Sequence, residues 1–234
     1  MRALIFAGGA GTRLSEETHN KPKPLVTVGE IPILQHIINW YAKFGITKFT
    51  ALTGYKGFQI SEYFESVRLS YPELSLETLQ TGETTQTGGR LRVALDTFPD
   101  ESFLVTYGDG ICDVDIEGLM KFHDNHGLLA TVTAVRPVAR FGSLEITDEK
   151  VTQFKEKDQL SQSWINGGYF VVHRKILNYL GSDDMPFERD PLSNLAKDGE
   201  LGAFKHHGAW FPMDTMREKT ELEKIWASGQ APWK

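Results

Sequence analysis

The stretch Gly8-Gly9-Ala10-Gly11-Thr12-Arg13-Leu14 follows directly on the apolar run Ala3-Leu4-Ile5-Phe6. The apolar run predicts a short buried strand, and the glycines let the backbone turn tightly where it leaves that strand. Such a turn exposes backbone N–H groups that suit a phosphate chain. Arg13 adds a planar guanidinium, and Lys23 in Lys21-Pro22-Lys23-Pro24 adds a second cation. We therefore expect this strand and loop to bind a triphosphate.

Two familiar phosphate loops do not account for this stretch. The P-loop pattern G-x-x-x-x-G-K-[ST] is absent from the chain. The dinucleotide fingerprint needs glycine at its sixth position, which is Leu14 when counted from Gly9. An ordinary glycine-rich turn remains the alternative for the loop, and a solvated surface position remains the alternative for Lys23. Pro22 and Pro24 favour a binding role, because they stiffen the segment that carries Lys23.

The composition describes an acidic chain that is long enough for one α/β domain. The chain has 234 residues, 40% of them hydrophobic, and a formal net charge of −6. It can therefore bury a sizeable core, and it is a poor candidate for binding nucleic acid. The single cysteine, Cys112, favours a reducing compartment and is expected to be a buried free thiol. Met1 leads directly into the first strand, so we expect a cytoplasmic protein with no signal peptide and no membrane partner.

Strands and helices alternate along the first half, which predicts a parallel sheet with crossover helices. Expected strands cover 3–6, 48–52, 74–79, 103–107 and 130–135, and expected helices cover 31–44, 59–64, 87–97 and 116–126. The second half predicts a hairpin of 142–146 and 151–154 around Asp148-Glu149, strands at 168–173 and 201–204, and helices at 176–180, 187–198 and 215–227. With no linker or repeat, we expect one domain over 1–234, with a nucleotide-binding part at about 1–115 and a substrate-binding part at about 116–234.

Asp109 and Asp214 are the candidate metal ligands. Asp109 follows an apolar strand between Gly108 and Gly110, and Asp214 stands between an apolar stretch and a helix start. Mg²⁺ prefers one or two carboxylates together with phosphate oxygens and water, which fits such a pair. The alternatives are a turn residue for Asp109 and a helix N-cap for Asp214.

Other titratable residues indicate structural roles. Asp115, close to Asp113, is well placed to cap a helix that begins at residue 116. His123 and His126 have a spacing that can bind metal, but no further Cys or His partner is evident, so packed or solvated histidines are expected. The same holds for the pair His206-His207.

Six motifs, in this order, resemble the sugar-1-phosphate nucleotidylyltransferase family. They span essentially the whole chain, and six of them in order make chance an unconvincing explanation. The resemblance implies a Rossmann-like, mostly parallel sheet flanked by helices, of the nucleotide-diphospho-sugar transferase type. The motifs are the loop 8–14 with Pro22-Lys23-Pro24, Thr87-Gly88-Gly89, Gly108-Asp109-Gly110, Glu156-Lys157, Asn166-Gly167-Gly168 and Met213-Asp214-Thr215.

The resemblance also implies a role for each matching residue. Arg13, Lys23 and Asp109 would be catalytic, and Asp109 with Asp214 would bind Mg²⁺. The substrates would be a nucleoside triphosphate and a sugar 1-phosphate. The nucleotide would contact Ala7, Gly8, Gly9, Gly11, Thr12, Arg13, Gln80, Thr87 and Gly88, and the sugar phosphate would contact Gly142, Glu156, Lys157, Asn166 and Gly168.

Within this family, further stretches are most similar to the branch that uses CTP and glucose 1-phosphate. They include Gly54-Tyr55-Lys56-Gly57, Arg140-Phe141-Gly142 and the tail Ala231-Pro232-Trp233-Lys234. The chain departs from that branch by a shorter segment between Tyr63 and Thr87, where the branch carries an extra segment that packs subunits together. It also has Asp158 where proline is usual. A homo-oligomer is expected from the branch. The shorter segment weakens that expectation, because the missing part is the one that packs subunits together there.

Three other functions remain open at this point. The first is the same reaction with UTP, dTTP or GTP, or with another phosphate acceptor. The second is a metal-dependent glycosyltransferase, for which Asp113-Val114-Asp115 supplies a D-x-D pattern. The third is a non-catalytic nucleotide-binding subunit, which the presence of Arg13 and Lys23 disfavours.

Overall fold

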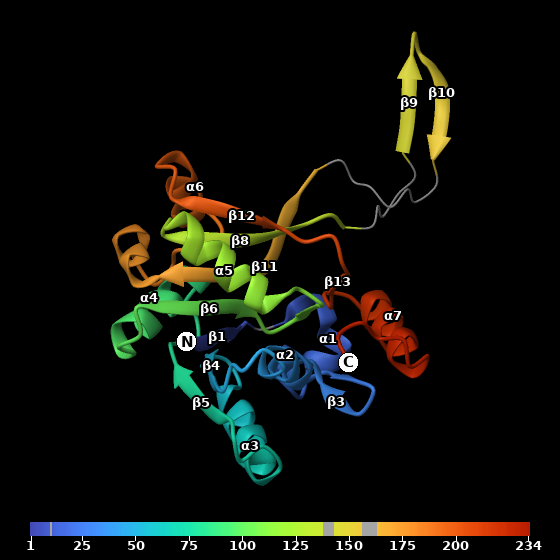
Figure 1. Cartoon of the computed structure of the whole chain (residues 1–234). Coiled ribbons are helices and arrows are strands. Elements are labelled where there is room, and N and C mark those ends of the chain that lie inside the picture. Colours follow the sequence, from blue (N-terminus) through green and yellow to red (C-terminus); the bar gives the residue numbers. More distant parts are fainter. Residues whose placement is uncertain (10, 138–142, 156–162) are drawn as a thin grey trace.

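A seven-stranded, mostly parallel sheet forms the centre of the protein (Figure 1). The computed structural model describes residues 1–9, 11–137, 143–155 and 163–234. Within the sheet, only β11 runs antiparallel to its neighbours β6 and β8. The predicted α/β fold is therefore confirmed. The strand order is β12 (Leu201–Lys205), β8 (Ala130–Val135), β11 (Ile165–His173), β6 (Ser102–Tyr107), β1 (Arg2–Ala7), β4 (Lys48–Thr53) and β5 (Ser75–Gln80).

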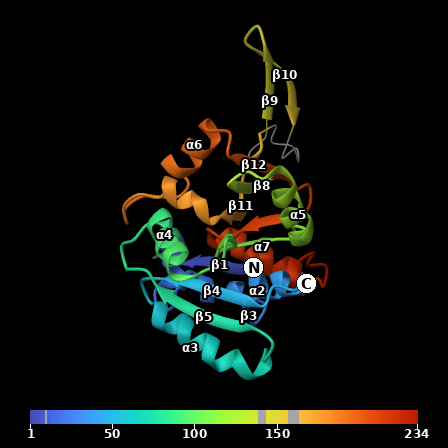
Figure 2. The same cartoon turned by 60° about the vertical axis from the view of Figure 1, so that its left-hand side comes forward.

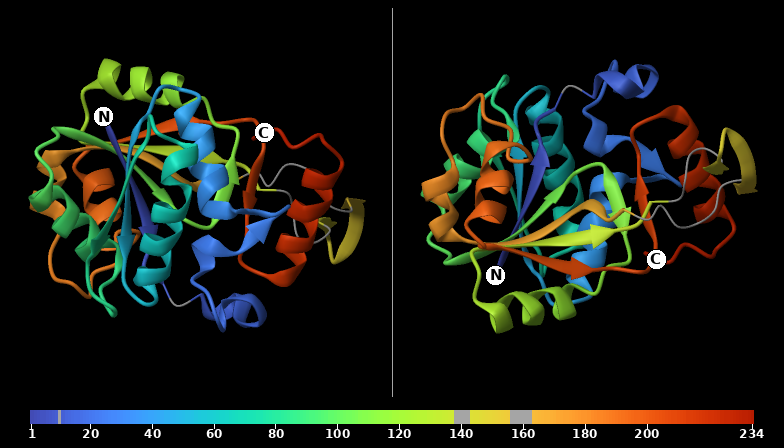
Figure 3. Two further views of the ribbon diagram at one scale, coloured as in Figure 1. Left: turned by 90° about the horizontal axis from the view of Figure 1, so that it is seen from below. Right: turned by 90° about the horizontal axis from the view of Figure 1, so that it is seen from above.

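Helices cover both faces of the sheet (Figures 2 and 3), because its central strands are apolar on both sides. In β1, Ile5 belongs to the core that includes α2, and Phe6 belongs to the opposite core that includes α4. Among the described residues, no helix has the length and apolarity needed to cross a membrane. The helices are α1 (Ser15–Thr18), α2 (Ile33–Ala42), α3 (Gly57–Val67), α4 (Thr87–Thr97), α5 (Ile116–His126), α6 (Asp190–Lys197) and α7 (Met216–Ala227).

The helix predictions hold best where end signals are strong. The bounds of α4 and α5 are those predicted, and Asp115 caps α5, its Oδ1 accepting a hydrogen bond from the backbone N–H of Gly118 at 2.9 Å. The helix predicted at 176–180 is instead the 3-10 helix η4 (Arg174–Tyr179). A run this short makes few hydrogen bonds, and the 3-10 form is common in such pieces.

Two pairs of very short strands were not predicted. They are β2 (Thr27–Val28) with β3 (Ile31–Pro32), and β7 (Gly110–Cys112) with β13 (Trp210–Pro212). The pairing of β7 with β13 matters most, because it joins segments about a hundred residues apart. The backbone N–H of Met213 also donates to the carbonyl of Asp109 at 2.9 Å. The residues that follow β6 and those that follow β13 are thereby held side by side.

The predicted hairpin exists as β9 (Ser143–Thr147) and β10 (Lys150–Lys155). It projects away from the body of the molecule (Figures 1 and 3). Asp148 and Glu149 both have positive φ, 47° and 65°, as a two-residue turn of this kind requires. Residues 138–142 and 156–162, on either side of the hairpin, are outside the described part, so the predictions for Gly142, Glu156 and Lys157 are not placed.

Candidate active site

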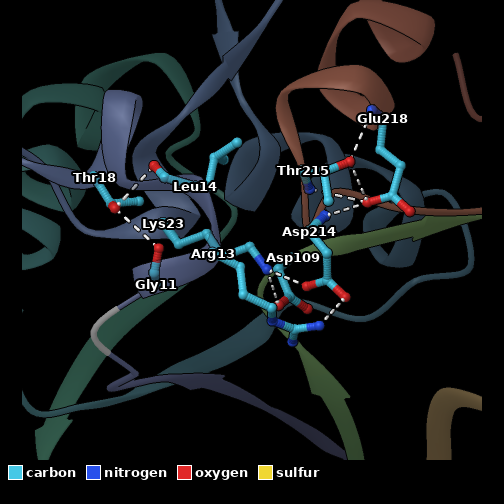
Figure 4. Close-up of polar contacts among 9 residues, drawn as sticks. All are labelled: Gly11, Arg13, Leu14, Thr18, Lys23, Asp109, Asp214, Thr215 and Glu218. Carbon is cyan, nitrogen blue, oxygen red and sulfur yellow. Dashed lines mark hydrogen bonds and ion pairs between the residues drawn. The ribbon is translucent and has the colours of Figure 1, made fainter.

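Four charged side chains from distant parts of the chain meet at the carboxyl ends of β1 and β6 (Figure 4). The Lys23 Nζ lies 2.6 Å from Asp109 Oδ2 and 2.6 Å from Asp214 Oδ1. The Arg13 guanidinium donates to Asp214 Oδ2 at 2.9 Å. The structure therefore brings together Arg13, Lys23, Asp109 and Asp214, the residues to which the family resemblance assigns catalysis and metal binding.

Local backbone structure aims the Lys23 side chain at this point. Lys23 begins the 3-10 helix η2 (Lys23–Leu25), with Pro22 as its N-cap and Pro24 in its first turn. The backbone N–H of Val26 closes the turn on the carbonyl of Lys23 at 3.0 Å. Lys23 is only 8% exposed, so it is not a solvated surface lysine.

The two aspartates are fixed by different means. Asp109 follows Gly108, whose backbone lies close to β1. The N–H of Gly108 donates to the carbonyl of Phe6 at 3.0 Å, and an added Cβ would lie 2.8 Å from the same oxygen. Asp214 precedes α7, whose N-cap is Thr215, in a capping box with Glu218. The N-cap alternative for Asp214 is therefore wrong by one residue, and its carboxylate lies in the site.

The environment keeps Lys23 charged. Burial pushes the pKa of the Lys23 ammonium down, but the carboxylates of Asp109 and Asp214 outweigh burial and raise it. A cation fixed between two acidic groups at the rim of a cavity can neutralise negative charge that arrives with a phosphate.

The glycine loop forms one wall of a cavity of about 550 Å³ beside these charges. Gly11 has a φ of 64°, a conformation that glycine adopts without strain. The Thr18 hydroxyl lies 3.0 Å from the Gly11 carbonyl and holds the loop (Figure 4). The predicted nucleotide residues that line the cavity are Ala7, Gly8, Gly9, Gly11, Thr12, Arg13 and Thr87.

Two predicted nucleotide residues, Gln80 and Gly88, are not among those that line this cavity. Gln80 lines a separate cavity, where its Oε1 accepts a hydrogen bond from Thr53 Oγ1 at 2.9 Å. Gly88 packs against a loop of the second half: its N–H donates to the carbonyl of Met185 at 3.0 Å, and a Cβ would come within 2.6 Å of that oxygen. The need for glycine at 88 is therefore explained by this loop.

Arg90 is a site residue that the sequence reasoning missed. Its guanidinium is 4% exposed in the wall of the large cavity. It donates to the carbonyl oxygens of Gly8 at 3.1 Å and Thr53 at 2.7 Å, and to Thr81 Oγ1 at 2.6 Å. Burial lowers the pKa of this guanidinium. The available signal was its position four residues before Ala94, on the buried side of α4.

A second cavity, of about 330 Å³, adjoins the first and shares Arg13, Tyr107 and Asp109 with it. Predicted sugar-phosphate residues Asn166 and Gly168 line it. The Asn166 Oδ1 accepts a hydrogen bond from the N–H of Gly168 at 2.8 Å. Gly168 has a φ of 80°, and a Cβ there would lie 2.5 Å from the Tyr107 ring. The charged residues therefore stand where two adjacent cavities meet.

Three histidines singled out in the sequence have hydrogen-bond partners within the fold. His123 Nδ1 and His126 Nε2 both contact Thr131 Oγ1, at 2.8 and 2.7 Å, and His206 Nε2 lies 2.8 Å from Asp113 Oδ1. Cys112 is buried and free, as predicted, and burial raises the pKa of its thiol. A protonated thiol is a poor metal ligand.

The donor set at Asp109 and Asp214 fits a divalent cation. Both carboxylates point at one position, now shared with the Lys23 ammonium, and both line the second cavity. Carboxylate oxygens that leave room for phosphate oxygens and water are what Mg²⁺ prefers.

Comparison with known proteins decides the family. A model of the nucleotidyl transferase family matches residues 2–215. The chain belongs to this nucleotidyl transferase family. Its members with similar sequences include the glucose-1-phosphate cytidylyltransferase of Salmonella typhimurium, 44% identical over 254 residues, with 100% of this chain and 99% of that protein covered. A probable glucose-1-phosphate cytidylyltransferase of Bacillus subtilis is 41% identical, with the same coverage.

Solved structures agree with the nucleotidyl transferase fold. A putative glucose-1-phosphate thymidylyltransferase from Bacillus anthracis, crystallised with a sucrose, superposes with a TM-score of 0.76 at 22% identity. The match covers 96% of this chain and 94% of that one. At this identity the likeness shows the fold alone, and it confirms the fold implied by the motif resemblance.

Proposed function

We propose that this nucleotidyltransferase joins glucose 1-phosphate to CTP, and that it releases CDP-glucose and pyrophosphate. The observation that carries the proposal is the meeting of Arg13, Lys23, Asp109 and Asp214 at the junction of two cavities. The choice of CTP and glucose 1-phosphate rests on the full-length cytidylyltransferase relatives.

In this reaction, a phosphate oxygen of the sugar 1-phosphate attacks the α-phosphorus of the nucleotide in line. The new bond joins that oxygen to the α-phosphorus, and the bond from the α-phosphorus to the bridging oxygen of pyrophosphate breaks. The attacking oxygen is already anionic, so no general base is required. Catalysis then depends on positioning and on neutralising charge.

The residues of the site fit these two tasks. The glycine loop and Arg13 would hold the triphosphate in the larger cavity. Lys23 lies at the junction, where it would neutralise the negative charge that both substrates bring to the α-phosphorus. Asn166 and Gly168 would take the sugar phosphate in the smaller cavity. The first part of the chain would thus supply the nucleotide site, and much of the second would supply the acceptor site.

Asp109 and Asp214 are the residues that would hold Mg²⁺. When bound, the ion withdraws electron density from the α-phosphate and screens the repulsion between the two anionic substrates. Both carboxylates are already positioned by the pairing of β7 with β13.

The glycosyltransferase alternative loses its main support. Asp115 caps α5, and Asp113 accepts hydrogen bonds from the N–H of Ala209 at 2.7 Å and from His206. The D-x-D letters therefore have structural partners. A direct test is to identify the phosphate product: pyrophosphate supports nucleotidyl transfer, whereas a nucleoside diphosphate released from a nucleotide-sugar would refute it.

A further inference from the structure

A loop of the second half, which includes Asp183 and Met185 and ends at Glu188, is held against the first turn of α4 (Figure 2). The backbone N–H of Gln86 donates to the carbonyl of Asp183 at 2.7 Å, and that of Gly88 donates to Met185. The Arg92 guanidinium donates to Asp183 Oδ1 at 2.6 Å. These contacts hold the loop where the nucleotide cavity meets the second cavity.

Glu188, at the end of this loop, places its carboxylate in the wall of the second cavity. Its Oε2 accepts a hydrogen bond from Thr87 Oγ1 at 2.7 Å, and its Oε1 accepts one from the Tyr107 hydroxyl. The Thr87 hydroxyl is itself fixed, since it accepts a hydrogen bond from the N–H of Phe187 at 2.8 Å. The carboxylate is therefore held in one orientation from two sides.

The Glu188 carboxylate retains acceptor positions for a ligand that donates hydrogen bonds. Within the described part of the chain, no Lys, Arg or His forms an ion pair with it. A carboxylate offers about four acceptor positions, and the two hydroxyl contacts use only part of them. A phosphate would be repelled here, whereas a sugar hydroxyl would gain a charge-assisted hydrogen bond.

We propose that Glu188 accepts a hydrogen bond from a hydroxyl group of the acceptor sugar, and that it thereby selects a neutral, hydroxylated sugar. This inference rests on the proposed function. Arg13 in the wall of the second cavity, with Lys23 in the adjoining cavity, would attract the phosphate, and Glu188 would accept hydrogen bonds from the hydroxyl groups. Acceptors that carry a carboxylate or a second phosphate at that end are rejected by repulsion.

The test is a cycle of Glu188→Ala against the 2-, 3-, 4- and 6-deoxy forms of glucose 1-phosphate, with pyrophosphate release as the assay. In the wild type, one deoxy form should lose roughly ten- to a hundredfold in kcat/KM. In Glu188→Ala that same form should react as well as glucose 1-phosphate, because the partner of the missing hydroxyl is already gone.

Matched variants separate contact from positioning. Asp184→Asn removes one charge from the same loop without reaching either cavity, and it should keep the wild-type pattern. Tyr107→Phe removes a donor to Glu188 but leaves the carboxylate, so the deoxy penalty should persist; its loss would mean that Glu188 acts only through Tyr107. If Glu188→Ala does not fold, Glu188→Gln replaces it; its amide oxygen still accepts a hydrogen bond but carries no charge, so the deoxy penalty should shrink, and an undiminished penalty would contradict the inference.

Two further results would overturn the inference. One is the same four penalties in Glu188→Ala as in the wild type. The other is a penalty for 2′- or 3′-deoxy-CTP that is present in the wild type and absent in Glu188→Ala, which would assign Glu188 to the ribose. A wild-type protein that releases no pyrophosphate with CTP and glucose 1-phosphate would refute the proposed function itself, which keeps the two failures distinct.

Discussion

Lys23 and Asp214 are 191 positions apart in the chain, yet the Lys23 Nζ lies 2.6 Å from Asp214 Oδ1. The contact depends on β7 and β13, each three residues long, whose pairing carries the segment after β13 to the end of β6. Asp109 joins the same ammonium from the other side. The buried Lys23 ammonium thus links the segments that carry Asp109 and Asp214 at the point where the two cavities meet.

Replacing Lys23 by alanine should lower kcat by about a hundredfold or more, because charge at the α-phosphorus is no longer neutralised. The measurement is steady-state pyrophosphate release. Lys21→Ala, which removes a lysine whose one ion pair among the described residues is with Glu17 at 3.4 Å, is the matched control and should stay close to the wild type. Near-normal turnover by Lys23→Ala would defeat the proposed role.

Asp109→Asn and Asp214→Asn should each fold but bind divalent metal more weakly. Each loses one of two carboxylates that point at a single position. Titration with Mn²⁺, followed by its electron paramagnetic resonance signal, measures this without reference to activity. Asp124→Asn, on the exposed side of α5, should bind metal as the wild type does. Equal affinity in all four proteins would place the metal elsewhere.

Gly8→Ala should destabilise the fold by roughly 1–3 kcal/mol, because its Cβ would lie 2.2 Å from Arg90 Cζ. Arg90 cannot move away without losing its hydrogen bonds to the carbonyl oxygens of Gly8 and Thr53, which would leave its buried guanidinium unsatisfied. Gly9→Ala is the control, since no described residue other than its chain neighbour lies within 4 Å of a Cβ there. Urea unfolding compares the two variants. A loss for Gly9→Ala as large as that for Gly8→Ala would disprove the packing argument.

Acid should destabilise the protein partly through His123. Burial, with His126 adding a smaller effect, lowers the pKa of the His123 imidazole. The folded state therefore keeps His123 neutral, whereas the unfolded chain takes up a proton near pH 6.5. Above that pH, His123 is neutral in both the folded and the unfolded state. As the pH falls below it, proton uptake favours the unfolded chain, so the free energy of unfolding decreases.

Urea unfolding between pH 7.5 and pH 5 tests this effect. His123→Asn should lose less stability over that interval than the wild type. Part of the pH dependence of stability should remain in His123→Asn, because burial also lowers the pKa of His36. An unchanged slope in His123→Asn would contradict the assignment.

The parts of the fold that the sequence predicted are those with strong local signals. Asp115 and Gly127 mark the two ends of α5, and the apolar run before Gly108 marks the end of β6. Because ligands in parallel sheets bind at the carboxyl ends of strands, Asp109 is a candidate site residue from its position, with a turn residue as the alternative. The convergence of Arg13 and Lys23 with Asp214 came from the resemblance to a family, not from spacing.

The parts that were not predicted depend on contacts between distant segments. Strands as short as β7 and β13 have no periodicity to detect. Gly88 is predicted at the nucleotide, and nothing in the sequence indicates that a side chain there would also obstruct the carbonyl of Met185. In the sequence, Glu188 looks like an ordinary surface charge and Arg90 is marked only by its spacing from Ala94. The fold shows Arg90 buried behind the glycine loop and Glu188 in a cavity wall.

The most direct test of the proposed reaction is pyrophosphate release with Mg²⁺ and glucose 1-phosphate, measured in parallel with CTP, UTP, dTTP, GTP and ATP. We predict strong turnover with CTP, together with formation of CDP-glucose. Turnover with a different triphosphate would keep the reaction but contradict the choice of base. No pyrophosphate with any of the five, nor with a panel of other sugar and non-sugar phosphates, would contradict nucleotidyl transfer at this site.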